Sequence, residues 1–167
     1  MGTDWAAVYE TTYADLVRFL YRLVWAEDRA QDLAQEAFVR ALRHEPENPR
    51  PWLFQVARNL ARDEARSAGR RRHHLALVRE EETDRMEEDP EQELERAERH
   101  AAARRALESL SERDREVLLL WDSGLSYQEI AEQTGLARGA IGTTLSRARQ
   151  RLVEAHRTGE ERHAASQ

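Results

Sequence analysis

An acidic run in the middle of the chain limits how the 167 residues can fold. Residues 75–100 hold 11 acidic residues against 4 arginines, and the few apolar residues within Arg79–Arg99, such as Met86 and Leu94, form no face. Such a segment buries too little apolar surface to offset the entropy lost on ordering. The sequence therefore predicts two folded blocks, residues 1–74 and 101–156, joined by a flexible acidic linker at 75–100 and followed by a frayed tail at 157–167. The end of the linker, from Pro90 onward, could join the next helix.

Both blocks are predicted to be helical, which places the chain in the all-α class. In the first block apolar residues recur at steps of three and four, the spacing of one helical face, and no strand-like alternation appears. Three prolines break the chain at His44–Pro51, and Pro51 suits the first turn of a new helix. With Asp28 as the expected N-cap of the second helix, the block becomes a small domain of three to four helices.

The second block carries the pattern of a helix-turn-helix domain. Two capping boxes, at Ser111–Asp114 and Ser126–Glu129, begin helices, and Gly135 ends the shorter one. A longer helix follows from Arg138, and we call it the recognition helix because such a helix fits the major groove of DNA. An ordinary pair of helices with a charged surface is the alternative. The polar residues expected to face DNA are Arg138, Thr143, Thr144, Arg147 and Arg149.

Two further surfaces stand out in the first block. A stripe of arginines at every fourth position of the third helix suits a nucleic-acid backbone, although a solvated charged face is an alternative. This arginine face comprises Arg58, Asn59, Arg62, Asp63, Arg66 and Arg70. The second helix points polar side chains away from its apolar stripe, which fits either a solvated face or a surface that binds a protein. This docking face comprises Asp32, Gln35, Glu36, Phe38 and Arg40.

No catalytic, metal or cofactor site is expected. The chain has no cysteine, which excludes disulfides and thiolate ligands, and it has no glycine-rich phosphate loop. His73 and His74 have no third ligand at metal spacing, and Ser109 and Ser111 have no nearby histidine base. No apolar run reaches the length of a membrane span, and no signal peptide opens the chain. The sequence predicts a cytoplasmic protein that is not an enzyme.

Taken together, the motifs resemble those of bacterial RNA polymerase sigma factors of the extracytoplasmic-function (ECF) type, which have only sigma regions 2 and 4. In the first block the resemblance rests on Asp32–Ala41 and Pro51–Leu60. In the second it rests on Leu110–Leu118, Gly124–Ala131 and Ser146–Arg149. The recognition helix departs from the common pattern, because Gly142 and Thr144 stand where basic residues are frequent in the family.

The resemblance implies a role for each surface. It implies that the docking face binds the clamp helices of the largest polymerase subunit. The flap of the second-largest subunit is implied as a further binding partner. The arginine face and the loop His44–Arg50 would bind and open the −10 promoter element and capture an unstacked base. The recognition helix would bind the −35 element as a duplex. Whether an anti-sigma factor binds the protein stays open.

Several alternatives remain open at this point. The linker is either a passive tether or, as the resemblance suggests, an acidic segment that threads the basic cleft of the polymerase. Its charge is also expected to compete with DNA for the arginine-bearing faces of the free protein. A stand-alone helix-turn-helix regulator, and a sigma mimic that sequesters an anti-sigma factor, are the rival functions.

Overall fold

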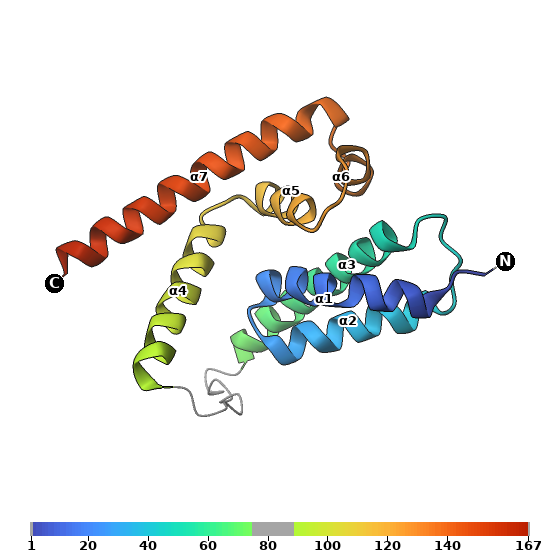
Figure 1. Cartoon of the computed structure of the whole chain (residues 1–167), viewed down its shortest axis with the longest axis horizontal. Coiled ribbons are helices and arrows are strands. Elements are labelled where there is room, and N and C mark those ends of the chain that lie inside the picture. The colour runs from blue at the N-terminus through green and yellow to red at the C-terminus, as the bar shows by residue number, and fades with distance from the viewer. Residues whose placement is uncertain (1, 75–88, 167) are drawn as a thin grey trace.

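The computed structural model describes residues 2–74 and 89–166, and it describes the side chains of the first range as far as residue 67. Every regular element in these ranges is an α-helix, so the all-α prediction is confirmed. Helices α1 to α3 form one unit and α4 to α7 the other (Figure 1). The acidic stretch at 75–88, with its expected roles as tether, cleft ligand or competitor of DNA, lies outside the described residues.

The first unit is a three-helix bundle of α1 (Trp5–Val24), α2 (Glu27–Ala41) and α3 (Pro49–His74). Helix α2 turns a row of alanines inward, which lets its neighbours approach closely. Larger side chains from the other two helices fill the core. The buried residues of this unit include Leu16, Phe19, Leu20, Ala30, Ala34, Ala37, Ala41, Leu53, Phe54 and Ala57.

The predicted boundaries in this unit need one correction. Helix α2 begins at Glu27 with Ala26 as its N-cap, so the prediction that Asp28 caps it is wrong. The cause is a short connection, because Trp25 closes α1 in a left-handed conformation with φ 55° and the next helix starts two residues later. Asp28 lies instead in the first turn of α2, where a negative charge complements the positive end of the helix dipole. Pro51 lies in the first turn of α3, as predicted.

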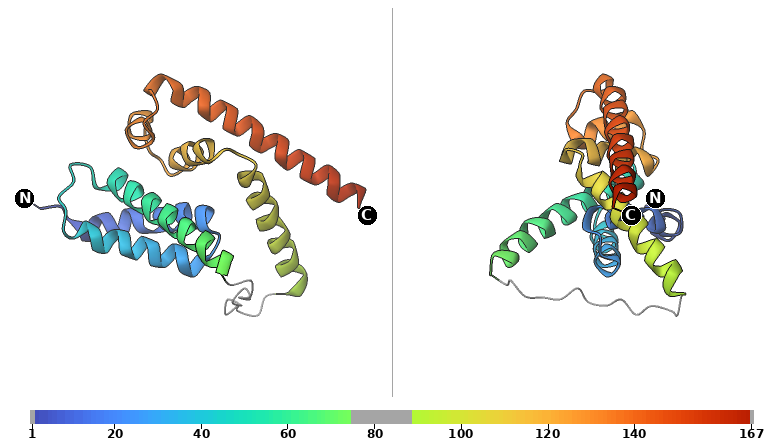
Figure 2. Two further views of the ribbon diagram at one scale, coloured as in Figure 1. Left: turned by 180° about the vertical axis from the view of Figure 1, so that it is seen from behind. Right: turned by 90° about the vertical axis from the view of Figure 1, so that its left-hand side faces the viewer.

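The second unit comprises α4 (Pro90–Glu108), α5 (Glu112–Asp122), α6 (Tyr127–Thr134) and α7 (Arg138–Ala165). The capping box at α6 is complete, since Ser126 accepts from the Glu129 amide at 3.2 Å and Glu129 accepts from the Ser126 amide at 2.8 Å. Gly135 ends α6 with φ 72°, which favours glycine. Helices α6 and α7 therefore form the predicted helix-turn-helix (Figure 2).

Both ends of this unit are helical beyond the predicted domain bounds. Helix α4 begins at Pro90, the residue from which the end of the linker is expected to be able to join the next helix. Helix α7 continues to Ala165, so the expectation of a frayed tail from residue 157 is corrected. A pairing between His156 and Glu160 at 3.3 Å, one turn apart, and the abundance of Ala, Glu and Arg support helix in this stretch.

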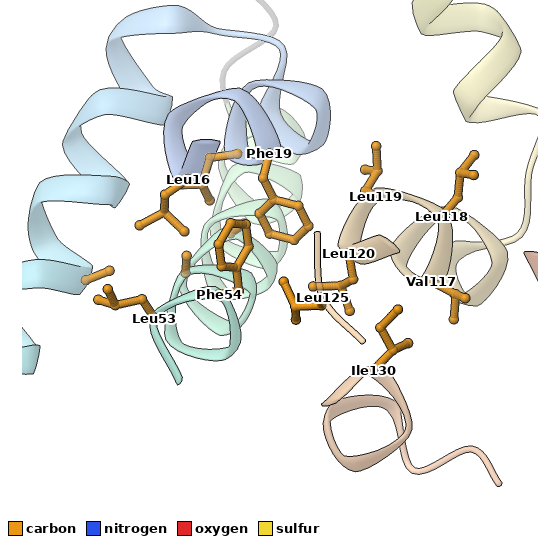
Figure 3. Close-up of a cluster of buried hydrophobic side chains, with 14 of the residues drawn as sticks. Leu16, Phe19, Leu53, Phe54, Val117, Leu118, Leu119, Leu120, Leu125 and Ile130 are labelled. Atoms are coloured by element: carbon orange, nitrogen blue, oxygen red, sulfur yellow. The ribbon is translucent and has the colours of Figure 1, made fainter. Parts of the chain in front are cut away.

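The two units share one apolar core. Phe19 and Phe54 meet edge to face, with their ring centroids 5.2 Å apart. On the other side of the seam, Leu120 of α5 and Leu125 of the α5–α6 connection point toward these rings (Figure 3). All four side chains are buried and belong to one continuous cluster. The blocks that the sequence predicts as separate domains are therefore packed against each other.

Candidate polymerase and nucleic-acid interface

The polar residues of the docking face are exposed to solvent. Asp32, Gln35, Glu36 and Arg40 are all exposed on α2, and the ion pairs of its charged members lie within that helix. Arg40 binds Glu36 at 2.6 Å, and Arg29 binds Asp32 at 3.2 Å. Short pairs of this kind on one helix leave the charges accessible to a partner.

Phe38 takes a different place from the other members of the docking face. It is half-buried among aromatic rings of α1, with centroid distances of 5.0 Å to Tyr9 and 6.2 Å to Tyr13. Its ring therefore helps to hold α2 on α1, while the charged side chains around it point outward.

Arg58 of the arginine face is buried, so the prediction that it lies on an outer surface is wrong. Only 4% of the residue is exposed, because the second unit covers this part of α3. Its Nη2 atom donates to the main-chain oxygen of Gln133 at 2.8 Å, and Nη1 lies 3.8 Å from Glu116 Oε2. Burial lowers the pKa of Arg58 despite the nearby carboxylate.

Arg62 extends the same contact by one helical turn. Its Nη2 and Nε atoms donate to Glu116 Oε1 at 2.6 and 2.9 Å, and Nε lies 3.5 Å from Glu112 Oε1. Both carboxylates belong to α5 in the second unit. Glu116 thus uses one oxygen for each arginine and joins α5 to α3.

The rest of the arginine face is less covered. Asn59, Asp63 and Arg66 are exposed. The side chain of Arg70 lies outside the described residues, so the structure does not place it.

The segment His44–Pro51, which leads into the first turn of α3, also contacts the second unit. Asn48 donates to Glu129 Oε1 at 3.0 Å, and Arg50 donates to the main-chain oxygen of Ser123 at 2.5 Å. In return, Gln133 Nε2 donates to the main-chain oxygen of Pro51 at 2.8 Å. The α5–α6 connection and α6 therefore lie against the segment that, by the family resemblance, is expected to bind the −10 element.

The recognition helix, α7, presents fewer free side chains than predicted. Arg138 and Thr143 are exposed near its start. Thr144 is only 5% exposed, and its hydroxyl donates to the Ala140 main-chain oxygen at 2.8 Å. The prediction that Thr144 faces DNA is therefore corrected, because Thr144 lies on the inner face of α7 with Ile141.

The two other arginines of α7 that are predicted to face DNA contact α5. Arg147 donates from Nε and Nη2 to the two carboxylate oxygens of Asp114, at 3.1 and 2.7 Å. These hydrogen bonds lower the pKa of Asp114, which is only 2% exposed, and raise the pKa of Arg147. Arg149 lies over the ring of Trp121, 4.1 Å from its centroid. Both arginines therefore help to hold α7 on α5, although their side chains reach the surface.

The acidic residues that meet the arginine face are not among the residues that the sequence singles out. Glu112 and Glu116 are one helical turn apart on α5, and Arg58 and Arg62 are one turn apart on α3. The two spacings match, but nothing in the sequence shows that α5 packs against α3. The contacts of the segment His44–Pro51 with the second unit likewise have no signal in the sequence.

The described residues hold neither a metal site nor a membrane span. No group of three or more His, Cys, Asp or Glu in the described ranges is arranged to hold a metal ion. No helix within those ranges is long and apolar enough to cross a membrane.

Comparison with family models matches both units. The model described as "Sigma-70 region 2" matches residues 8–71, and the model described as "Sigma-70, region 4" matches residues 100–152. The first range contains the docking face and all of the arginine face, and the second contains the helix-turn-helix.

Relatives with curated names match most of the chain. RNA polymerase sigma factor YlaC of Bacillus subtilis is 30% identical over 87% of this chain and 87% of its own length. ECF RNA polymerase sigma factor SigL of Mycobacterium tuberculosis is 32% identical over 83% of this chain and 81% of its own length. The chain spans only 57% of ECF RNA polymerase sigma factor SigE of Mycolicibacterium smegmatis, to which it is 33% identical over 84% of this chain. It spans 32% of the Xanthomonas campestris relative RfaY.

Solved structures show the same fold. The sigma factor RpoE of Bartonella quintana, in complex with the anti-sigma factor NepR, aligns with a TM-score of 0.67 and 27% identity. The alignment covers 91% of this chain and 96% of that one. CnrH, in complex with the cytosolic domain of CnrY, aligns with a TM-score of 0.62 and 24% identity, over 90% of this chain and 85% of that one.

The pair of Arg147 and Asp114 predicts how the second unit responds to pH. Because the pKa of Asp114 is lowered in the folded protein, its stabilising effect is full above its ordinary pKa of 3.8. The effect is lost as the pH falls through the lower pKa of the folded state. Asp114→Asn should therefore lower the melting temperature by several degrees at pH 7, and the difference from the native protein should shrink below about pH 4.

Thermal denaturation between about pH 3 and pH 7 measures this difference, with Asp63→Asn as the control because Asp63 is exposed and lies away from the ends of α3. Equal melting temperatures for the native protein and Asp114→Asn at pH 7 would contradict the stabilising role.

Proposed function

The chain belongs to the ECF family of RNA polymerase sigma factors, and from this premise we propose that it directs the polymerase core to promoters and starts transcription there. The observation that carries the proposal is the joint presence of three surfaces on one chain. They are an exposed charged docking face on α2, an arginine face on α3 and a helix-turn-helix formed by α6 and α7. A cytoplasmic location follows from this function.

The docking face is proposed to bind the clamp helices of the largest subunit. Exposed charges favour this role, because charged surfaces set the rate and specificity of association more than its strength. The flap of the second-largest subunit is the proposed partner of the second unit. An anti-sigma factor is a further proposed partner, since the relative RpoE is described in complex with one.

The arginine face and the loop His44–Arg50 are proposed to hold the opened −10 element. The arginines would bind the phosphates of the separated strand, and the exposed amide of Asn59 offers both a donor and an acceptor to an unstacked base. Arg138 and Thr143 are the exposed side chains that would reach the −35 duplex. The linker, in this proposal, threads the basic cleft of the polymerase.

Run-off transcription with purified core polymerase tests the proposal. Promoters selected from a random library by the reconstituted holoenzyme serve as templates, and the core without the protein is the control. Transcripts that require the protein support the proposal, and no promoter-specific transcript from any selected template would refute it.

The same assay tests a second candidate function, a sigma mimic that binds an anti-sigma factor without acting at promoters. The burial of Arg58 and Thr144 favours this candidate, because it removes two of the expected DNA contacts from the surface. A protein that binds an anti-sigma factor but yields no transcript with core would be such a mimic.

Reversing the charge of the docking face should weaken binding to the polymerase. The double variant Asp32→Arg/Glu36→Arg should lower affinity for core by roughly tenfold or more, because both side chains point into solvent and neither is part of the core of the fold. Titration of labelled protein with core measures the affinity. Glu10→Arg/Glu98→Arg is the control, because both residues are exposed and lie on other helices, and an equal loss in both variants would contradict a specific docking face.

Promoter opening and duplex binding should separate by variant. Asn59→Ala should impair opening of a double-stranded promoter, and a template with a pre-melted bubble should restore much of the activity. Arg138→Ala should weaken binding to the −35 duplex and leave binding to the bubble nearly unchanged. Arg147→Ala is unsuitable here, because Arg147 also holds Asp114. Identical behaviour of Asn59→Ala and Arg138→Ala in both assays would contradict the division of roles.

A further inference from the structure

We propose that Thr3 and Trp5 are positioning residues for promoter opening. They lie just before and at the start of α1, and they hold the loop His44–Arg50 in the shape that receives the −10 element. The inference rests on the proposed function, because that function gives the loop its role at the −10 element. It adds two residues that lie outside the docking face, the arginine face, the loop and the recognition helix.

The loop does not fix its own shape through main-chain hydrogen bonds. Within the described residues, the main chain of Glu45, Pro46 and Glu47 makes no hydrogen bond with other main-chain groups. Pro46 also lacks the amide hydrogen that such a bond needs. A segment without main-chain hydrogen bonds is held only by the contacts of its side chains. The shape of this part of the loop therefore depends on what His44 and Glu45 contact.

The carboxylate of Glu45 is bound by the segment that precedes α1. Its Oε2 atom accepts from the Thr3 main-chain amide at 2.9 Å and from the Thr3 hydroxyl at 3.3 Å. A Cβ atom added to Gly2 would lie 3.2 Å from Oε1, so the carboxylate also closely approaches the main chain there. Asp4 caps α1 by accepting from the Ala7 amide at 3.2 Å, which fixes the adjacent Thr3 relative to that helix. Hydrogen bonds to a charged acceptor are stronger than neutral ones.

Aromatic contacts support the first residue of the loop. The His44 ring lies 5.2 Å from the Trp52 ring, and the Trp5 ring lies 6.5 Å from the same Trp52 ring, measured between centroids. Trp5 and Trp52 are half-buried and pack against the core, whereas His44 is exposed. Helix α1 thus supports Trp52 through Trp5, and Trp52 supports the His44 ring at the surface.

Both contacts lie within the first unit, between the start of α1 and the chain that leads from α2 into α3. The contacts with the second unit involve the other end of the loop, at Asn48 and Arg50. The support of His44 and Glu45 therefore does not depend on where the second unit lies. It is available whenever the first unit binds DNA.

A loop held in one shape favours promoter opening in two ways. An ordered loop loses less conformational entropy when it binds unstacked bases, so more of the contact energy is left to separate the strands. A fixed loop also rejects bases that do not fit, whereas a free loop can adapt to them. Loss of the support should therefore impair opening and broaden the base preference at the −10 element.

Opening of a double-stranded promoter by the holoenzyme tests the inference. Thr3→Pro removes the amide donor and the hydroxyl together, Thr3→Val removes the hydroxyl alone, and Thr3→Ser keeps both. Opening should fall roughly fivefold in Thr3→Pro, fall less in Thr3→Val and stay close to native in Thr3→Ser, as expected for loss of hydrogen bonds to a charged group. Thr158→Val is the control, because the Thr158 hydroxyl donates to the Glu154 main-chain oxygen within α7.

A double-variant cycle shows whether Thr3 acts through Glu45. Glu45→Ala should impair opening by itself, and the addition of Thr3→Pro should cause little further loss, because the shared contact is already gone. Losses that add up would overturn the inference. Melting curves show whether the variants stay folded, and Thr3→Val takes the place of Thr3→Pro in the cycle if Thr3→Pro does not.

Promoters selected from a random library give a readout that a merely structural role would not move. The holoenzyme with Thr3→Pro should accept more bases at the −10 element than the native holoenzyme, with an unchanged preference at the −35 element. Native opening together with native base preference in Thr3→Pro would overturn the inference. Absence of transcripts with the native protein counts against the proposed function, whereas normal native transcription beside unaffected variants counts against the inference alone.

Discussion

The carboxylate of Glu116 holds the two units of this protein together at their charged seam. One of its oxygens accepts two hydrogen bonds from Arg62, and the other lies near Arg58, which is almost fully buried. A buried guanidinium is costly unless a carboxylate and further acceptors replace its water. Each donor left unsatisfied costs about 1–3 kcal/mol. Two of the nitrogens of Arg58 have no hydrogen bond among the described residues.

The packing of the two units therefore depends on two opposing contributions. The apolar seam of Phe19, Phe54, Leu120 and Leu125 favours packing of the two units, while the incompletely satisfied Arg58 opposes it (Figure 3).

Much of the fold is accessible from the sequence. The three- and four-residue spacing of apolar residues predicts the helices, and the Ser126 capping box with Gly135 predicts the turn of the helix-turn-helix. Helix boundaries that depend on neighbouring residues are harder to predict: Ala26 replaces Asp28 as N-cap because Trp25 closes α1 in a left-handed conformation.

The family resemblance identifies the candidate surfaces. Whether these surfaces are exposed or covered cannot be predicted from the sequence, because it depends on packing between distant segments. Residue spacing places Arg58 on the polar side of α3, yet the second unit covers that side. Thr144 is polar, but its hydroxyl is satisfied by the Ala140 carbonyl one turn back, which lets it point inward. Periodicity shows which side chains share a face, and it does not show what covers that face.

The central claim is that the carboxylate of Glu116 joins the two units through Arg58 and Arg62. Energy transfer between dyes attached at Glu10→Cys and Gln150→Cys, one exposed position in each unit, tests it most directly. The account predicts that Glu116→Gln lowers the transfer efficiency, because both arginines then lose their shared carboxylate, and that Glu108→Gln, which pairs only within its own helix, leaves it unchanged. An unchanged transfer efficiency in Glu116→Gln would contradict it.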